Sequence, residues 1–274
     1  MIDDNTNYLS EFTEDKNGII SFPRYYLDDF FIDELDETDY TIEHDRVYLR
    51  EGTCNLVTLR AIRQKYYNAN YWYDAIAHLT ILSFFIHKND NWDNLFLAGP
   101  KFIRGVHASP KDIHPNCIFY NASHAKAVLF NSYRCKNDEI FFVRDIDDDI
   151  LHKRGFEFRC FYYHGKFTAA SCEEYINLDE CMENRIVQFI ANNAHSFPYT
   201  DAIIDIFVND KKILIIEFNC FGADSFTGAG QFDWEKEYNL LTGKNNLGPL
   251  FKCNQGASPG TPSCDKELLF LELP

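Results

Sequence analysis

Apolar positions in the second half of the chain follow the period of β-strands in two places. Residues 157–171, "EFRCFYYHGKFTAAS", alternate around His164 and Gly165, which predicts a β-hairpin with its turn at these two residues. Residues 202–219, "AIIDIFVNDKKILIIEFN", are apolar on both faces, as expected for two strands covered on both sides. Between the hairpins, residues 182–194 have helical spacing. The inward side chains of this helix should be Ile186, Val187, Phe189 and Ile190.

The first half of the chain gives weaker patterns. Residues 71–86, "YWYDAIAHLTILSFFI", predict a largely buried helix. Asparagine, glycine and proline then mark loops within residues 89–102. Short strands are expected at residues 101–106, 125–130 and 140–146. Acidic side chains crowd residues 28–39 among aromatic ones, so a folded acidic face is expected there, with docking of a partner as the alternative.

Composition narrows the class of protein. A chain of 274 residues with 46% hydrophobic residues can bury a core as one large domain or two lobes. Its net charge of -16 disfavours general binding of nucleic acid, but leaves room for a locally basic cleft or a basic partner. The nine cysteines lack zinc spacing and are expected as free thiols. With no signal peptide or membrane-spanning run, we expect a soluble, cytoplasmic protein.

Two carboxylates interrupt the apolar pattern of the second hairpin. If the turn centres on Lys211, Asp205 lies opposite Glu217 on the neighbouring strand, and Asn219 lies on the same face. A two-residue turn would instead place Asp205 opposite Ile216. The first register brings together two like charges, which repel each other and are costly to bury.

Three arrangements would relieve this repulsion. One carboxyl group could hold a proton, a lysine or arginine could reach in, or a divalent cation could lie between the two. Asn219 favours the cation, since its carbonyl oxygen adds a third hard ligand to Asp205 and Glu217. Such ligands suit Mg²⁺ or Mn²⁺, and Mg²⁺ often completes its shell with water and phosphate. The alternative is an ordinary surface aspartate and an ordinary strand end.

Basic side chains near these acids would suit phosphate groups. In the first hairpin, alternation places Glu157 and Arg159 on one face, and an arginine in mid-strand is well placed for a fork-shaped contact to phosphate. Arg104 and Lys111, in "FIRGVHASPKDI", add two more cations. Together with the acidic set they make a nucleotide site a reasonable hypothesis.

The order of these motifs resembles a known fold. "EFRCF", "GK" and "AAS", followed by a strand aspartate and "IEFN", resemble the ATP-grasp fold. More narrowly, "SPKD" (109–112), "EFRCF" (157–161) and "FNCFG" with a following "FDW" (218–234) resemble the cell division cycle protein 123 family, an ATP-grasp branch that assembles translation initiation factor 2 in eukaryotes. The match covers roughly residues 100–240.

The resemblance implies an α+β ATP-grasp fold in which two subdomains with antiparallel sheets enclose a nucleotide cleft. The implied parts are an acidic and helical N-terminal region belonging to the first lobe (1–98), the strands of a small subdomain (99–146), a C-terminal subdomain with the metal site (147–250) and a tail (251–274).

The resemblance also assigns roles to residues. Mg²⁺ would be held by Asp205, Glu217 and Asn219. ATP would contact Arg104, Lys111, Glu157 and Arg159, and adenine would take backbone hydrogen bonds from Val143, Arg144 and Asp145.

Two functions from different classes follow. The first is an ATP-dependent assembly factor or chaperone for a protein client such as the gamma subunit of translation initiation factor 2. The second is an ATP-dependent ligase that joins a carboxylate to an amine or thiol through an acyl phosphate, which Glu217 favours because glutamate is more typical of ATP-grasp enzymes at large. An α+β domain without a nucleotide is the third and plainest hypothesis.

Overall fold

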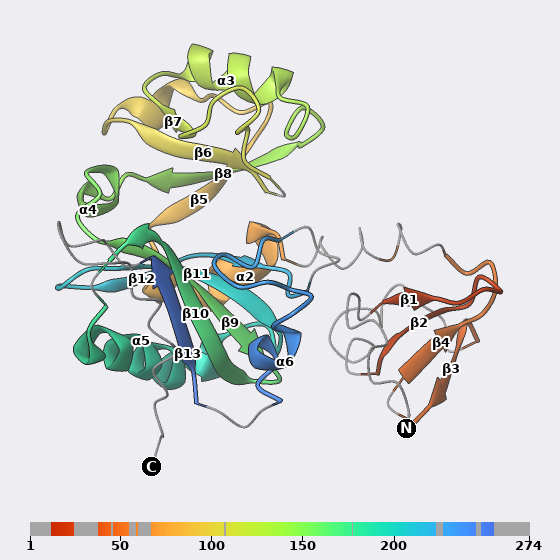
Figure 1. The fold of residues 1–274 in the computed structure, drawn as a ribbon. Coiled ribbons are helices and arrows are strands. Elements are labelled where there is room, and N and C mark those ends of the chain that lie inside the picture. The colour runs from red at the N-terminus through yellow and green to blue at the C-terminus, as the bar shows by residue number, and fades with distance from the viewer. Residues whose placement is uncertain are drawn as a thin grey trace.

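Three β-sheets organise the chain (Figure 1). The computed structural model describes residues 12–24, 38–44, 46–54, 59, 67–106, 108–176, 178–222, 227–244 and 248–254. No helix in this part of the chain is long and apolar enough to cross a membrane.

The C-terminal sheet has five strands in the order β12-β11-β9-β10-β13. They are β9 (Phe156–Tyr163), β10 (Lys166–Tyr175), β11 (Ala202–Val208), β12 (Ile213–Asn219) and β13 (Leu250–Asn254). Only β13 runs parallel to its neighbour, β10. Both expected hairpins are confirmed. His164 and Gly165 have φ of 48° and 71°, and two positive φ angles give the turn whose twist matches the flanking strands.

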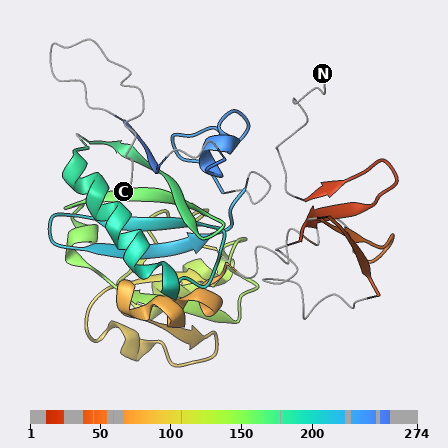
Figure 2. The same cartoon turned by 90° about the horizontal axis from the view of Figure 1, so that it is seen from below.

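Helix α5 (Glu180–Asn193) covers one face of this sheet (Figure 2). The side chain of Asp179 accepts a hydrogen bond from the backbone N–H of Met182 and so caps the helix. Ile186, Val187 and Ile190 are buried in the core shared with the sheet, and Phe189 packs partly against it. The expected helix and its inward face are therefore confirmed. We call this sheet with α5 the large lobe.

A second sheet, in the order β5-β8-β6-β7, forms the small lobe with helix α3 (Ala122–Asn131). Its strands are β5 (Ser83–His87), β6 (Lys101–Gly105), β7 (Ile118–Phe119) and β8 (Ile140–Asp145). The strand expected at residues 125–130 is wrong, because these residues lie in α3. The Asn121 side chain accepts a hydrogen bond from His124 N–H and caps that helix.

The helix expected at residues 71–86 is only half right. Helix α2 (Ala69–Ile76) and a short 3₁₀ turn, η2 (Ala77–Leu79), are followed by strand β5. A continuous apolar run fits a buried helix and a buried strand equally well. The remaining short helices are η3 (Asp93–Phe96), α4 (Asp148–Leu151), η4 (Ala194–Ser196) and α6 (Tyr238–Leu241).

A third sheet, at the N-terminal end, has the order β1-β2-β4-β3 and is antiparallel throughout. Its strands are β1 (Thr13–Glu14), β2 (Ile20–Pro23), β3 (Tyr40–Glu43) and β4 (Arg46–Leu49). Figure 1 shows it beside the large lobe. The expected N-terminal region therefore contains a sheet as well as helix α2. Most of the acidic stretch at residues 28–39 lies outside the described residues.

Strand pairing also moves two of the expected boundaries. β5 precedes residue 99 but pairs with β8 of the small lobe, and β13 lies mostly beyond residue 250 but pairs with β10 of the large lobe. The expected divisions at 98/99 and 250/251 therefore cut through sheets. The tail after Asn254 lies outside the described residues.

Helix α2 joins the small lobe to the large one. The Trp72 ring lies 5.7 Å from that of Phe142 on β8 and 5.9 Å from that of Phe218 on β12, measured between centroids. All three side chains are almost fully buried. This aromatic contact fixes the edge strand β12 of the large lobe against the small lobe.

The centre of the large lobe should be sensitive to cavities. Ile204 on β11 is fully buried, so Ile204→Ala should cost about 2–5 kcal/mol of unfolding free energy. The expected fall in melting temperature is about 2–4 °C per kcal/mol, measured by thermal unfolding. Ile140→Ala is the matched control, because Ile140 is 36% exposed and its loss should shift the melting temperature far less. Equal shifts would contradict this packing.

Candidate functional site

A β-bulge in the β11–β12 hairpin brings Asp205 opposite Glu217. The turn spans two residues, closed by a hydrogen bond of 3.0 Å from Asn209 N–H to the carbonyl of Lys212. Its register pairs Ile206 with Ile215, but Ile216 is then an extra residue and the next pair is Asp205 with Glu217. The expected pairing is confirmed, whereas the expected turn centred on Lys211 is wrong. The bulge supplies the shift that a longer turn was expected to supply.

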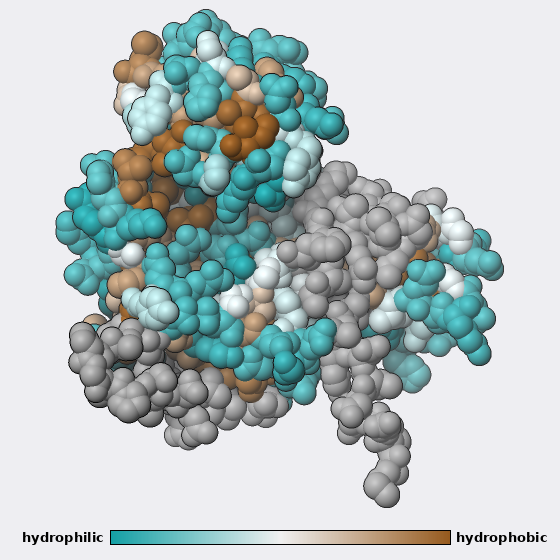
Figure 3. All heavy atoms as spheres, turned by 45° about the horizontal axis from the view of Figure 1, so that its top comes forward, coloured by the Kyte–Doolittle hydropathy of each residue, from teal (hydrophilic) through white to brown (hydrophobic). Residues whose placement is uncertain are grey.

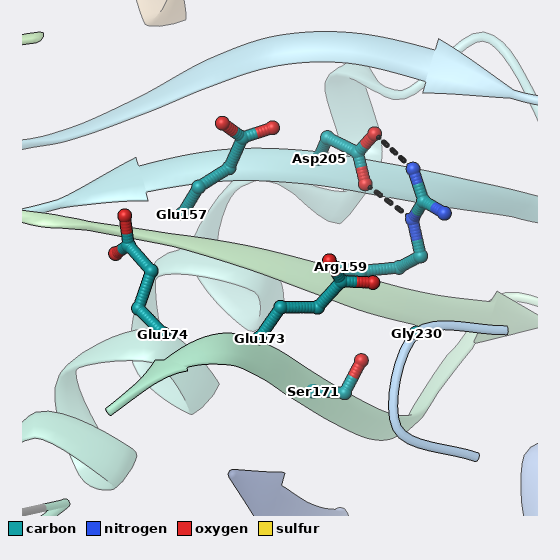
Figure 4. Close-up of a pocket in the computed structure, with 7 residues that line it drawn as sticks. All are labelled: Glu157, Arg159, Ser171, Glu173, Glu174, Asp205 and Gly230. Carbon is teal, nitrogen blue, oxygen red and sulfur yellow. Dashed lines mark hydrogen bonds and ion pairs between the residues drawn. The ribbon is translucent and has the colours of Figure 1, made fainter. Parts of the chain in front are cut away.

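The same register continues across the sheet as a row of polar residues. Directly paired residues on successive strands are Glu217, Asp205, Arg159, Ser171 and Lys252. Paired residues point to the same face, so one polar row crosses the sheet on the face opposite α5. Figure 4 shows its middle members, Asp205, Arg159 and Ser171.

Arg159 forms a fork-shaped ion pair with Asp205. Its Nε and Nη2 donate to Oδ1 and Oδ2 at 2.9 and 2.8 Å, and its Nη1 donates to the carbonyl of Gly228 at 2.8 Å. The side chain of Asp205 is only 4% exposed. The hydrogen bond to Asp205 raises the pKa of Arg159, whereas burial raises the pKa of Asp205 and Arg159 opposes that rise. The two charge-assisted bonds identify a carboxylate paired with a guanidinium.

Arg104 reaches Glu217 from the other lobe. It lies on β6, and its Nη1 donates to Oε2 of Glu217 on β12. Burial acts to raise the pKa of Glu217, but Arg104 and the hydrogen bond from Asn219 outweigh it and lower that pKa. Of the three arrangements considered from sequence, the structure therefore shows arginines reaching in, one to each carboxylate.

Asn219 contacts both acids. Its Nδ2 donates to Oδ2 of Asp205 at 3.0 Å and to Oε1 of Glu217 at 3.3 Å. Rotating the amide by 180° would place its oxygen between the same two carboxylates. Among the described residues, no three His, Cys, Asp or Glu side chains gather as a metal site. A divalent cation would therefore depend on this set of two carboxylates and an amide.

The small lobe also binds the bulge itself. Arg144 Nη2 donates to the carbonyl of Ile216 at 2.8 Å, and Thr80 Oγ1 donates to that of Ile215 at 2.6 Å. Burial lowers the pKa of Arg144 to about 10, so it remains a cation at neutral pH. Two carbonyl groups at the bulge thus accept hydrogen bonds from outside the large lobe. Thr80 was not identified from sequence, because nothing local signals this contact.

The expected backbone contacts of the adenine strand are only partly available. β8 is a central strand, and Val143 and Arg144 pair with β5 on one side and with β6 on the other. Their backbone groups therefore face sheet partners, which argues against their role with a base. Asp145 N–H donates to the carbonyl of Leu82 at 3.1 Å, and its side chain accepts from Lys101 Nζ at 2.6 Å. Strand β8 and its sheet pairing end at Asp145, so a base would meet the backbone beyond it.

Lys111 lies in an exposed loop near the acids. The loop is held by Asp112, which accepts hydrogen bonds from Ser132 Oγ at 2.6 Å and Tyr133 N–H at 3.0 Å. The charge of Lys111 acts to lower the pKa of Glu157, Asp205 and Glu217. The structure thus brings Lys111 into the same electrostatic environment as the acidic set.

A cavity of about 250 Å³ opens beside the Asp205–Arg159 pair. It is lined by Glu157, Arg159, Ser171, Glu173, Glu174, Asp205 and Gly230 (Figure 4). Partial desolvation, together with the charges of Asp205 and Glu217, raises the pKa of Glu157 to about 7. Ser171 Oγ is buried and has no hydrogen-bond partner in the described part of the chain.

Sequence reasoning missed Ser171 and Lys252. β10 contains a bulge at Thr168, which moves the partner of Arg159 from Ala170 to Ser171. Without that bulge the hairpin register pairs Arg159 with an apolar residue, so Ser171 entered only as the last residue of the "AAS" motif and without a role at the site. Lys252 fell in the expected tail, although β13 places it beside Ser171.

Comparison with known proteins gives relatives in sequence and in fold. No family model matches the sequence. A putative CDC123-like protein of Acanthamoeba polyphaga mimivirus is 23% identical over 309 residues, covering 87% of this chain and 94% of the relative. Cdc123 from Schizosaccharomyces pombe, 15% identical, matches with a TM-score of 0.55 over 71% of this chain and 97% of its own. The resemblance to the Cdc123 family is confirmed. The expected α+β ATP-grasp fold, which Cdc123 shares, is confirmed with it.

A D-alanine–D-alanine ligase from Bacillus anthracis complexed with ATP is a weaker match. It is 14% identical, with a TM-score of 0.46 over 64% of each chain.

Removing one partner of the Arg159–Asp205 pair should lower the unfolding free energy much more than replacing both partners with apolar residues. In protein without nucleotide or metal, Arg159→Met should lower the unfolding free energy by about 3 kcal/mol, because Asp205 is left buried and unpaired. Adding Asp205→Leu should recover most of that loss. Thermal unfolding of the single and double variants measures both effects. A double variant less stable than Arg159→Met would contradict the ion pair.

Glu157 should make stability depend on pH. A carboxyl group whose pKa rises from 4.5 to about 7 on folding binds its proton more tightly in the folded state. Its ionisation therefore destabilises the folded protein. This loss of unfolding free energy is absent below pH 4.5 and complete above about pH 7. Glu157→Gln should thus match wild type at pH 4 and exceed its melting temperature at pH 8. The comparison is made in EDTA, and a difference independent of pH would disprove this account.

Proposed function

We propose that this chain binds Mg²⁺–ATP between the small and large lobes, with Asp205, Glu217 and Asn219 holding the metal. One observation carries the proposal. Two carboxylates face each other across neighbouring strands, one amide touches both, and one arginine from each lobe reaches in. The family resemblance supports it, since Cdc123 has the ATP-grasp fold.

The donor set suits Mg²⁺ in chemistry. Asp205 accepts three hydrogen bonds and Glu217 accepts two in this structure. An ionised carboxylate offers about four lone-pair sites, so each keeps room for a cation. Carboxylate and amide oxygens are the hard ligands that Mg²⁺ prefers. When bound, the ion would neutralise charge on phosphate oxygens.

The remaining contacts to the nucleotide follow from charge. Arg104, Lys111 and Arg159 are cations that surround the acidic set, and they would bind the phosphates. With metal and phosphate bound, each arginine could exchange a carboxylate partner for a phosphate one at little electrostatic cost. On the face shown in Figure 3, hydrophobic side chains gather in the hollow between the two lobes, which suits a base, and the backbone after Asp145 would contact it.

The biological role belongs to the same proposal. By family resemblance the chain would be an ATP-dependent assembly factor or chaperone for a protein client such as translation initiation factor 2 and its gamma subunit. A cytoplasmic location would follow from that role. The likeness to a CDC123-like protein over 87% of this chain supports a protein client.

A carboxylate–amine ligase is the second candidate, and one observation favours it. A ligase needs room for an acceptor beside the phosphates, and the cavity of about 250 Å³ borders Asp205 and Arg159. Steady release of ADP with a carboxylate substrate would identify the ligase. Nucleotide-dependent capture of the client without turnover would identify the assembly factor.

Titration calorimetry with ATP, with and without Mg²⁺, tests the shared site. We expect binding that depends on Mg²⁺ and is weakened at least about tenfold by Glu217→Gln or Asn219→Ala, because the first removes the charge of a metal ligand and the second removes a ligand. A saturating hundredfold excess over Kd should also stabilise the protein by about 2.7 kcal/mol. Glu139→Gln is the matched control, since Glu139 makes its surface contacts with His87 and Lys88. ATP affinity that is unchanged in the two site variants would refute the proposal.

A further inference from the structure

The cavity beside the Asp205–Arg159 pair has an unbalanced charge. Four carboxylates line it against a single guanidinium, that of Arg159. That guanidinium is already committed, since two of its nitrogens bond Asp205 and the third bonds the Gly228 carbonyl. Glu157, Glu173 and Glu174 form no ion pair within the described residues. These three carboxyl groups border one space, and none of them is paired with a cation in that part of the chain.

Ser171 gives an independent sign of a ligand. The residue is 1% exposed, and its Oγ has no hydrogen-bond partner in the described part of the chain. Figure 4 shows it pointing from β10 toward the space between Arg159 and Gly230. The chain at Gly230 passes so close that a Cβ there would lie 2.1 Å from Ser171 Oγ. A buried hydroxyl without a partner costs free energy, and a ligand in the cavity would supply the missing bond.

The volume of the cavity and the spacing of its carboxylates indicate which kind of cation it can bind. A divalent metal needs its ligands to converge within about 2.0–2.6 Å of one point. No three acidic, histidine or cysteine side chains of the described residues gather in that way. The cavity, at about 250 Å³, is too large for one ion and lies just below the range of drug-sized sites. A small organic cation fits both facts.

An ammonium group matches the available partners. It carries three donors and no acceptor, and it forms hydrogen bonds at about 2.7–2.9 Å to carboxylates that surround it loosely. Glutamate carboxylates accept only, and the Ser171 hydroxyl can also accept. We propose that this cavity binds a primary ammonium group at the end of an unbranched alkyl chain, held by Glu157, Glu173, Glu174 and Ser171. Its use, as an acceptor amine or as a lysine of the client, rests on the proposed function, whereas the binding does not.

Calorimetry on the full chain, without nucleotide or metal, tests the site. The probes are Nα-acetyl-lysine methylamide, its norleucine counterpart, which lacks the ammonium group, and 1,5-diaminopentane. We expect one or both amines to bind and the norleucine compound not to bind. Tighter binding of the lysine compound indicates a lysine of a protein, and tighter binding of the diamine indicates a free amine. Equal binding of the norleucine compound, or no amine binding, overturns the proposal.

Variants localise the binding. Glu173 and Glu174 are exposed on β10, so the double variant Glu173→Gln and Glu174→Gln should fold normally and lose at least about tenfold in affinity. Ser171→Ala should lose several-fold. Asp210→Asn, in the β11–β12 turn, is the matched control and should bind as wild type. Unchanged affinity in the double variant overturns the proposal. ATP binding is measured separately, so amine binding without ATP binding would reject the proposed function alone.

Discussion

The single extra residue at Ile216 determines what the site can be. Without that bulge, the two-residue turn would continue its register and pair Asp205 with Ile216. With it, Asp205 faces Glu217, and Asn219 comes within 3.0 and 3.3 Å of the two acids. A bulge bends a strand and turns side chains to a new face. Here it converts an apolar hairpin into one with a converging set of hard oxygen donors.

The same bulge attaches the two lobes. Carbonyl groups of Ile215 and Ile216 accept hydrogen bonds from Thr80 and Arg144. Because β12 is an edge strand, these carbonyl groups face the small lobe and not another strand of the large sheet. The bulge at Ile216 therefore accounts for the pairing of Asp205 with Glu217, for the oxygen donors that this pairing brings together, and for the contact of β12 with the small lobe. Placing a desolvated arginine there is tolerable because its partners are fixed carbonyl and hydroxyl groups.

Sequence patterns predicted those turns and strand faces that depend on neighbouring residues in the chain. The turn at His164 and Gly165 and the common face of Glu157 and Arg159 follow from period and turn residues. The pairing of Asp205 with Glu217 was predicted correctly but from a longer turn, and in the structure the bulge at Ile216 produces it. Two kinds of feature escaped. Apolar runs without a clear period were assigned to the wrong element, as in α3 and β5. Bulges, and contacts between lobes such as those of Arg104 and Thr80, depend on tertiary packing that no local window contains.

Two kinds of contact between the lobes have different consequences for a nucleotide. The bonds from Arg144 and Thr80 end on the backbone carbonyls of Ile216 and Ile215, which are not among the proposed metal ligands. The bond from Arg104 ends on Glu217, a proposed metal ligand. Under the proposed function, the first kind would persist while the second exchanged its partner. Nucleotide would then change the electrostatic contact between the lobes without separating them. The acidic cavity is lined by Arg159 and Asp205, so this exchange of partners would also change the charge around the cavity.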